Sequence, residues 1–362
     1  MVQKVRCLII VFLLLNTIVF AQKNFRDLKM TVGQSIVKIA DLPTANDKTE
    51  WHFADSITTD KMVKDAISQA LKKFGKHKPK LLWIMGRVED RIAVKNAIDA
   101  INKDKIPYIF DGSNWKEYTV IGPSGVTGQA EQSFIAVAMG GKADFQFHYM
   151  PVPAYQYQYW ELESKFDKDS ITKIMSEEKM KYTEKAKSLA SKFNTNIPGS
   201  KIYFQMGNMH TPKQTWVLEG LNQVFPEMRI IGGSQSDWAW QIYNGQIMEN
   251  SLYGIMITGD FTASQAMALK ETGKALEETA NTVLKAAKSD LKTRADIGIY
   301  FGCAGWNAEH QQQYKVMQDV LPTTTVFGRF NGGEIGRFDN EGSNKAGINL
   351  LSVLLISNSK KK

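Results

Sequence analysis

Short apolar runs that end in glycine recur along the chain and predict its secondary structure. The clearest are Lys80–Met85 before Gly86, Lys201–Met206 before Gly207, and Asp296–Phe301 before Gly302. Apolar runs of this length, rich in β-branched and aromatic residues, are typical of buried strands. A polar loop follows each run, and apolar residues then recur at helical spacing, so we expect a helix after each strand.

A second apolar run follows each predicted helix and also reaches a glycine. These runs cover 106–112, 228–233 and 323–328. The paired glycines, Gly86 and Gly112, Gly207 and Gly233, and Gly302 and Gly328, are separated by about the same number of residues in all three cases. The repetition predicts a strand–helix–strand unit used three times, with parallel strands and right-handed crossovers.

The remaining pattern predicts helices over 58–74, 170–193 and 262–291, and strands near 133–138, 253–257 and 350–356. We therefore expect an α/β fold of repeated strand–helix–strand units, forming mostly parallel or mixed sheets in two linked halves. The expected organisation is a signal peptide over 1–21, an N-terminal extension over 22–57, α/β domains over 58–261 and 262–357, and a basic tail over 358–362.

The first residues indicate export. Lys4 and Arg6 precede the apolar run Leu8–Phe20, and Val19-Phe20-Ala21 suits a signal peptidase, so cleavage is expected after about Ala21. A membrane anchor is the alternative, but a spanning helix needs about 20 apolar residues. We expect a periplasmic or extracellular protein that does not span the membrane after cleavage.

Charge and cysteine content narrow the chemistry further. Removing Lys4 and Arg6 from the formal charge of +8 leaves a mild basic excess, which weakly favours acidic partners. The sequence contains no nucleic-acid-binding motif. Cys303 is the only cysteine after residue 21, so no internal disulfide is expected there. The histidines are scattered without metal-ligand spacing, and we expect neither a metal nor a cofactor.

Several motifs in the C-terminal half resemble the FIST domain family. They are Ile231-Gly232-Gly233-Ser234 with Asp237, Tyr243-Asn244-Gly245, the strand ending in Cys303-Ala304-Gly305, and Gly333-Glu334-Ile335-Gly336 after Val326-Phe327-Gly328. The resemblance covers roughly 58–357 and is looser before about residue 200. It implies a sensory module that binds a small ligand such as an amino acid, with a signalling or envelope protein as a further partner.

The loops after the predicted strands are the expected ligand site, because ligands of open parallel sheets bind beyond the carboxyl ends of the strands. Arg329 or Arg87 would hold a carboxylate, Asp237 or Glu334 would face an ammonium group, and Trp306 would pack on apolar atoms. The complete candidate set is Arg87, Asn208, Ser234, Asp237, Trp306, Asn307, Arg329, Asn331 and Glu334.

Each candidate also has a purely structural interpretation. Arg329 could be a surface charge, Asp237 and Glu334 could cap turns, Cys303 could be a small buried residue, and His310 could lie on a helix surface. The chain has no nucleophile elbow, Walker motif or Gly-x-Gly-x-x-Gly, so we expect a binding protein and not an enzyme.

Two other binding functions remain open. Alternating aromatic residues over Tyr155–Trp160, and again at Trp238 and Trp240, would form a glycan-binding row if they lay exposed on one strand face. Alternatively, the same alternation would be a strand face packed on the core. A solute-binding protein for transport is the third possibility, since the first strand–helix–strand unit also suits that class.

Overall fold

The computed structural model describes residues 26–38, 53–113, 119–127, 131–152, 159–210, 212–235, 239–270, 275–339 and 342–358. The expected signal peptide and residues 359–362 of the expected basic tail lie outside these ranges. No helix among the described residues is long and apolar enough to cross a membrane.

Three successive segments of the chain have the same order of elements. The first contains β1 (Leu28–Lys38), α2 (Ser56–Phe74), β2 (Leu81–Arg87), α3 (Arg91–Ile101), β3 (Tyr108–Ser113), β4 (Val120–Gly122), β5 (Gly125–Val126) and β6 (Glu131–Gly141). The second contains β7 (Asp144–Pro151), α4 (Tyr159–Lys165), α5 (Lys168–Ala190), β8 (Ser200–Asn208), α6 (Lys213–Val224), β9 (Arg229–Gln235), β10 (Ala239–Tyr243), β11 (Gln246–Met248) and β12 (Ser251–Gly259). The third contains β13 (Thr262–Leu269), α7 (Leu276–Leu291), β14 (Ile297–Cys303), a 3₁₀ helix (Ala304–Glu309), α8 (His310–Val320), β15 (Thr325–Asn331), β16 (Glu334–Gly336), β17 (Lys345–Gly347) and β18 (Leu350–Ser357).

The three repeats interlock through exchanged hairpins. The described strands form three six-stranded sheets, ordered β1-β6-β2-β3-β10-β11, β7-β12-β8-β9-β16-β17 and β13-β18-β14-β15-β4-β5. Each sheet thus takes four strands from one repeat and a hairpin from another. Repeat 2 gives its hairpin to repeat 1, repeat 3 to repeat 2, and repeat 1 to repeat 3. This closed exchange joins each repeat to both of the others through backbone pairing.

The predicted α/β fold of repeated strand–helix–strand units is confirmed, but the described residues form three linked repeats and not the two halves expected. In each unit the two strands run parallel: β2 with β3, β8 with β9, and β14 with β15. The glycines themselves do not keep one register. Gly86 pairs with Gly112, whereas Gly233 pairs with Met206 and Gly328 with Tyr300. The first glycine of each pair holds the same place in its strand, one residue before the end, but the second glycines are not equivalent residues.

Local capping sets the start of three of the described helices. Asp55, Asp90 and Asp167 each accept a hydrogen bond from the backbone N–H three residues later, and so begin α2, α3 and α5. These helices match or extend the expected ones, and β6, β12 and β18 lie where strands were expected.

Two expectations about the elements need correction. The helix expected over 262–291 is wrong in its first part, because Thr262–Leu269 forms β13 and the helix begins at Leu276. The segment expected only as an extension contains β1, which pairs with β6 along its whole length. The expected boundary between 261 and 262 falls between β12 and β13, where the second repeat ends and the third begins.

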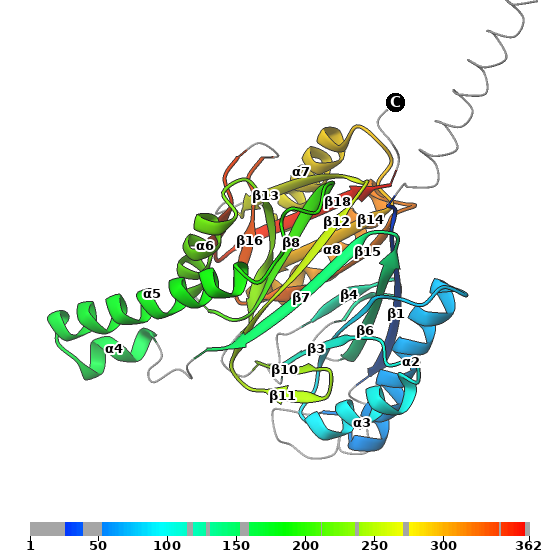
Figure 1. Ribbon diagram of the computed structural model, residues 1–362, viewed down its shortest axis with the longest axis horizontal. Helices are drawn as coiled ribbons and strands as arrows, with labels where there is room; N and C mark the ends of the chain where they lie inside the picture. The colour runs from blue at the N-terminus through cyan, green and yellow to red at the C-terminus, as the bar shows by residue number, and fades with distance from the viewer. Residues whose placement is uncertain are drawn as a thin grey trace, which may run out of the picture.

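A central core lies between the sheets, and the helices cover their outer faces. Inward-facing residues of all three sheets, such as Trp83, Phe204 and Phe327, form the central cluster. Separate outer clusters join α2 and α3 to the first sheet, α5 and α6 to the second, and α7 and α8 to the third. Figure 1 shows α2, α3, α6 and α7 around the outside of the body, with α4 and α5 reaching out from it.

Candidate ligand-binding site

A buried polar network crosses the central core at the carboxyl ends of the parallel strands. Arg329 of β15 is ion-paired with Asp111 of β3, and neither side chain is exposed. Tyr253 of β12 donates a hydrogen bond to the same carboxylate, and Trp83 Nε1 donates to the Tyr253 hydroxyl at 3.1 Å. Burial raises the pKa of Asp111, and the Arg329 guanidinium opposes that rise. The network therefore links residues from all three repeats.

The other described candidates are buried in the same region. Arg87 ends β2 and is 5% exposed, with its guanidinium 5.0 Å from the Phe53 ring. Burial lowers the pKa of Arg87 to about 10, because the low dielectric disfavours its charge. Asn208 ends β8 and donates a hydrogen bond to the carbonyl of Ala239 at 3.0 Å. Both side chains thus lie buried at the carboxyl ends of their strands.

Ser234 of β9 and Glu334 of β16 lie on neighbouring strands of the second sheet. Ser234 exchanges backbone hydrogen bonds with Gly332 and Gly333, and its side chain is wholly buried. Glu334 pairs with Gly233 and accepts a hydrogen bond from the Leu350 N–H at 3.1 Å. Burial holds the pKa of Glu334 well above its ordinary value, which favours the neutral acid.

Several interpretations from the sequence are settled by these positions. Arg329 is not a surface charge, because it is fully buried against Asp111. His310 is not on a helix surface: its ring stacks on Phe330, and burial lowers its pKa to about 3. Cys303 is buried, as the structural interpretation proposed, and Glu334 does accept a backbone N–H.

The remaining candidates are placed only in part. Asp237 lies outside the described residues. Trp306 and Asn307 fall in the 3₁₀ helix, and Asn331 ends β15 opposite Cys303, but their side chains are not described. No group of three or more His, Cys, Asp or Glu that could hold a metal ion occurs within the described ranges.

The proposed aromatic rows do not form as expected where they are described. Residues 153–158 lie outside the described part, and Tyr159 and Trp160 begin the helix α4 and not a strand. Trp238 is also outside it. Trp240 is 2% exposed and packs on Phe110, with ring centroids 5.1 Å apart. Trp240 is therefore a core residue.

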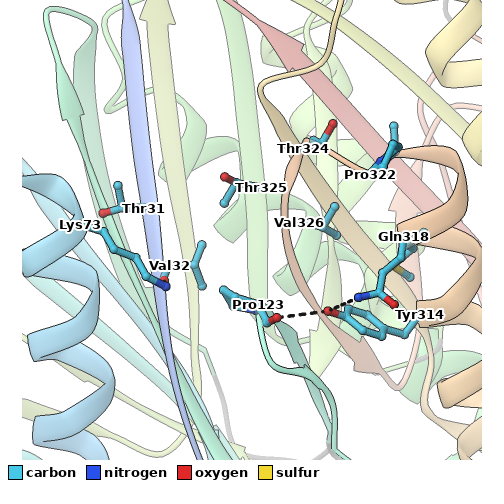
Figure 2. Close-up of a pocket in the computed structure, with 13 residues that line it drawn as sticks. Thr31, Val32, Lys73, Pro123, Tyr314, Gln318, Pro322, Thr324, Thr325 and Val326 are labelled. Atoms are coloured by element: carbon cyan, nitrogen blue, oxygen red, sulfur yellow. Dashed lines mark hydrogen bonds between the residues drawn. The ribbon is translucent and has the colours of Figure 1, made fainter.

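A cleft that the sequence did not suggest opens between the first and third repeats. Its cavity volume is about 640 Å³, within the usual range for small-ligand sites. The walls are β1 and the end of α2 on one side, and α8 with the start of β15 on the other, with the β4–β5 turn between them. We call it the β1–β15 cleft. Figure 2 shows Lys73 and Val32 facing Tyr314, Gln318 and Val326 across it.

Polar groups are distributed around this cleft. The Tyr314 hydroxyl donates to the Pro123 carbonyl at 3.3 Å and accepts from Gln318 Nε2 at 3.2 Å. Lys73 Nζ donates to the Val32 carbonyl at 2.8 Å. An ammonium group has three donors, so Lys73 can bind a further acceptor. Apolar atoms of Met317 and Pro322 complete the lining, which suits an amphipathic small molecule.

Comparisons with known proteins add little to this geometry. No protein-family model matches the chain, and no curated protein matches it significantly. Among solved structures, the cyanuric acid hydrolase from A. caulinodans is similar over 91% of this chain and 99% of that chain, with 9% identity and a TM-score of 0.38. A similarity at that level carries no argument about activity, and the FIST resemblance stays a prediction.

Proposed function

We propose that this chain is an exported ligand-binding module of the FIST type that binds a small molecule without transforming it. The observation that carries the proposal is the β1–β15 cleft, which combines a volume of about 640 Å³ with a cation, a phenol, an amide and apolar walls. A small amphipathic solute such as an amino acid derivative matches that lining.

We place the ligand in this cleft and not at the strand ends. The described polar side chains at the strand ends are nearly or fully buried, and Arg329 already has its charge compensated by Asp111. A ligand carboxylate there would have to displace the Asp111 carboxylate from a buried ion pair. Such a displacement is costly, because breaking a buried pair leaves an uncompensated charge.

A thermal-shift screen tests the proposal. Protein beginning at residue 22 is screened against amino acids, small carboxylates, oligosaccharides and acetylated dipeptides. A ligand at about one hundred times its Kd should stabilise the native state by about 2.7 kcal/mol. The same screen is run on Val32→Phe, which places a ring at the cleft wall, and on Ile36→Phe, which introduces a ring at an exposed position of β1.

The expected result is a rise in Tm with at least one compound class, lost in Val32→Phe and kept in Ile36→Phe. A rise that persists in Val32→Phe would place the ligand elsewhere. A rise with oligosaccharides alone would favour the glycan-binding alternative. No rise with any compound would argue against a small-ligand function.

A further inference from the structure

The β1–β15 cleft has two counterparts in the same molecule, because the three repeats share one strand order. Strands β2, β8 and β14 each end one residue after a glycine, which identifies equivalent positions. Trp83, Phe204 and Ile299 are equivalent on this basis. Each of them pairs with a residue of the next strand, β6, β12 or β18, and that residue pairs in turn with one on the edge strand, β1, β7 or β13. The edge-strand residues reached in this way are Val32, Phe147 and Gln265.

The second cleft is filled by aromatic side chains of the protein itself. Phe147 lies at the position of Val32, and its ring centroid is 5.5 Å from that of Tyr243. Arg329 pairs with Val120 in the same way as Asp111 pairs with Gln241, so Val120 and Gln241 are equivalent. Gly122 and Tyr243 each follow two residues later, and are therefore counterparts. At the β1–β15 cleft, a valine and a glycine stand at the positions of this phenylalanine and tyrosine, and the Gln34 side chain lies where a Cβ of Gly122 would point.

The third cleft is filled by an amide. Gln265, at the position of Val32, donates from Nε2 to the carbonyl of Ile230 at 3.0 Å. The N–H of Ile230 donates to the side-chain oxygen of Asn344 at 3.1 Å. Amide groups of the protein therefore satisfy both backbone groups of Ile230 at this strand edge.

In the second cleft, the backbone groups of the equivalent residue, Tyr108, are also hydrogen-bonded by an amide-bearing residue of the protein. Tyr108 donates its N–H to the side-chain oxygen of Asn244 at 2.7 Å and accepts from the Asn244 N–H at 3.1 Å. Tyr108, Ile230 and Val326 are equivalent, because they pair with Leu82, Tyr203 and Gly298, each five residues before the end of its strand. Two of these three residues are thus capped by amides.

Val326 is the exception, and it lines the β1–β15 cleft. Thr325 donates its N–H to Asp296 beside β14, and Phe330 donates to Thr119 beside β4. Since backbone groups alternate in direction along a strand, the N–H and C=O of Val326 point away from β14. The hairpin strand β4 pairs only with Gly328 and Arg329, so it does not reach Val326. No described residue hydrogen-bonds to these two groups of Val326.

We propose that the β1–β15 cleft recognises a peptide-type amide that carries a carboxylate, as in a short peptide or an N-acylated amino acid. The amide C=O accepts from the Val326 N–H and an amide N–H donates to the Val326 C=O, as Asn244 does at Tyr108. The carboxylate reaches Lys73, whose Nζ already lies on the opposite wall at the Val32 carbonyl. This inference rests on the proposed ligand-binding function and names its ligand class.

Calorimetric titration with acetylated dipeptides tests the inference on wild-type protein and on Val32→Gln. The variant copies the third cleft, where a glutamine fills the equivalent place and bonds the equivalent carbonyl. Ile36→Gln is the control, because it introduces a glutamine on the same strand at an exposed position, whereas Val32 is buried. Acetylated dipeptides should bind wild-type and Ile36→Gln alike, and affinity should fall at least tenfold in Val32→Gln. Melting temperatures of all three proteins show that each is folded.

Chemical variants of the ligand test each contact. N-methylation of the amide should weaken binding at least tenfold, and replacing the carboxylate by a carboxamide should weaken it in wild-type but not in Lys73→Met. If carboxylates without an amide bind in the cleft and no acetylated dipeptide does, the inference is wrong while the ligand-binding function stands. If acetylated dipeptides bind Val32→Gln and Val32→Phe as they bind wild-type, the cleft is not their site and the inference also fails.

Discussion

Replacing Arg329 by methionine would leave the Asp111 carboxyl in the core without its cation. Both side chains are wholly buried, and the pair joins the first repeat to the third. Removing one partner of such a pair typically costs about 3–5 kcal/mol, because the remaining charge is desolvated and uncompensated. Since native proteins are stable by only about 5–15 kcal/mol, the variant should lose a large part of its unfolding free energy.

Urea unfolding at pH 7 measures this loss, with Arg294→Met as the control at an exposed arginine. The control should change the unfolding free energy by less than about 0.5 kcal/mol. The double variant Asp111→Leu with Arg329→Met should be more stable than Arg329→Met alone, because no buried charge remains. An Arg329→Met variant as stable as the control would refute the assigned ion pair.

The pH dependence gives an independent check. Burial raises the pKa of Asp111 and Arg329 opposes the rise, so its removal should raise that pKa further. A folded state that binds the proton more tightly than the unfolded state gains stability as the pH falls. Arg329→Met should therefore recover stability relative to wild-type between pH 8 and pH 5, and the double variant should not.

Further predictions concern residues elsewhere in the fold. Gly328→Ala should strongly destabilise the protein, because its Cβ would lie 1.8 Å from the Tyr300 carbonyl oxygen. Gly305→Ala is the control, since its Cβ would meet nothing closer than 3.7 Å. Urea unfolding measures the free energy of unfolding of both variants. The folded-state pKa of His310 is depressed to about 3, so its contribution to stability is present above its ordinary pKa and is lost as the pH falls toward 3. His310→Gln should flatten that acid limb, and NMR should show no His310 titration above about pH 5. Glu334 has a raised pKa, so wild-type should lose stability at alkaline pH relative to Glu334→Gln, and a denaturation series from pH 6 to pH 9 measures the difference.

Local pattern was enough to predict the strand–helix–strand units. Buried parallel strands need continuous apolar runs, and the covering helices need apolar residues at helical spacing, so both are visible without tertiary information. The same reasoning failed at Thr262–Leu269. Alanine, glutamine, methionine and leucine favour a helix in isolation, but pairing with β18 along the whole segment imposes a strand.

The chemistry of the candidate residues depended on partners far away in the chain. Asp111 precedes Arg329 by 218 residues, so the sequence could not show that the arginine is neutralised in the core. The exchange of short hairpins was equally hidden, since β4 has only three residues and β5 two. The β1–β15 cleft is lined in part by Val32, Gly122 and Val326, none of which carries a polar side chain that the sequence could have flagged. The structure shows it as a cavity, and the comparison of three equivalent places singles out Val326 among its lining residues.

The most direct test of the ligand site is NMR of protein labelled at valine. Val32 and Val326 line the cleft, and Val88 follows β2 at the carboxyl ends of the strands. On titration with the compound that gives the largest thermal shift, the signals of Val32 and Val326 should move and that of Val88 should stay unchanged. Movement of Val88 with no change at Val32 and Val326 would contradict the account and return the ligand to the strand ends.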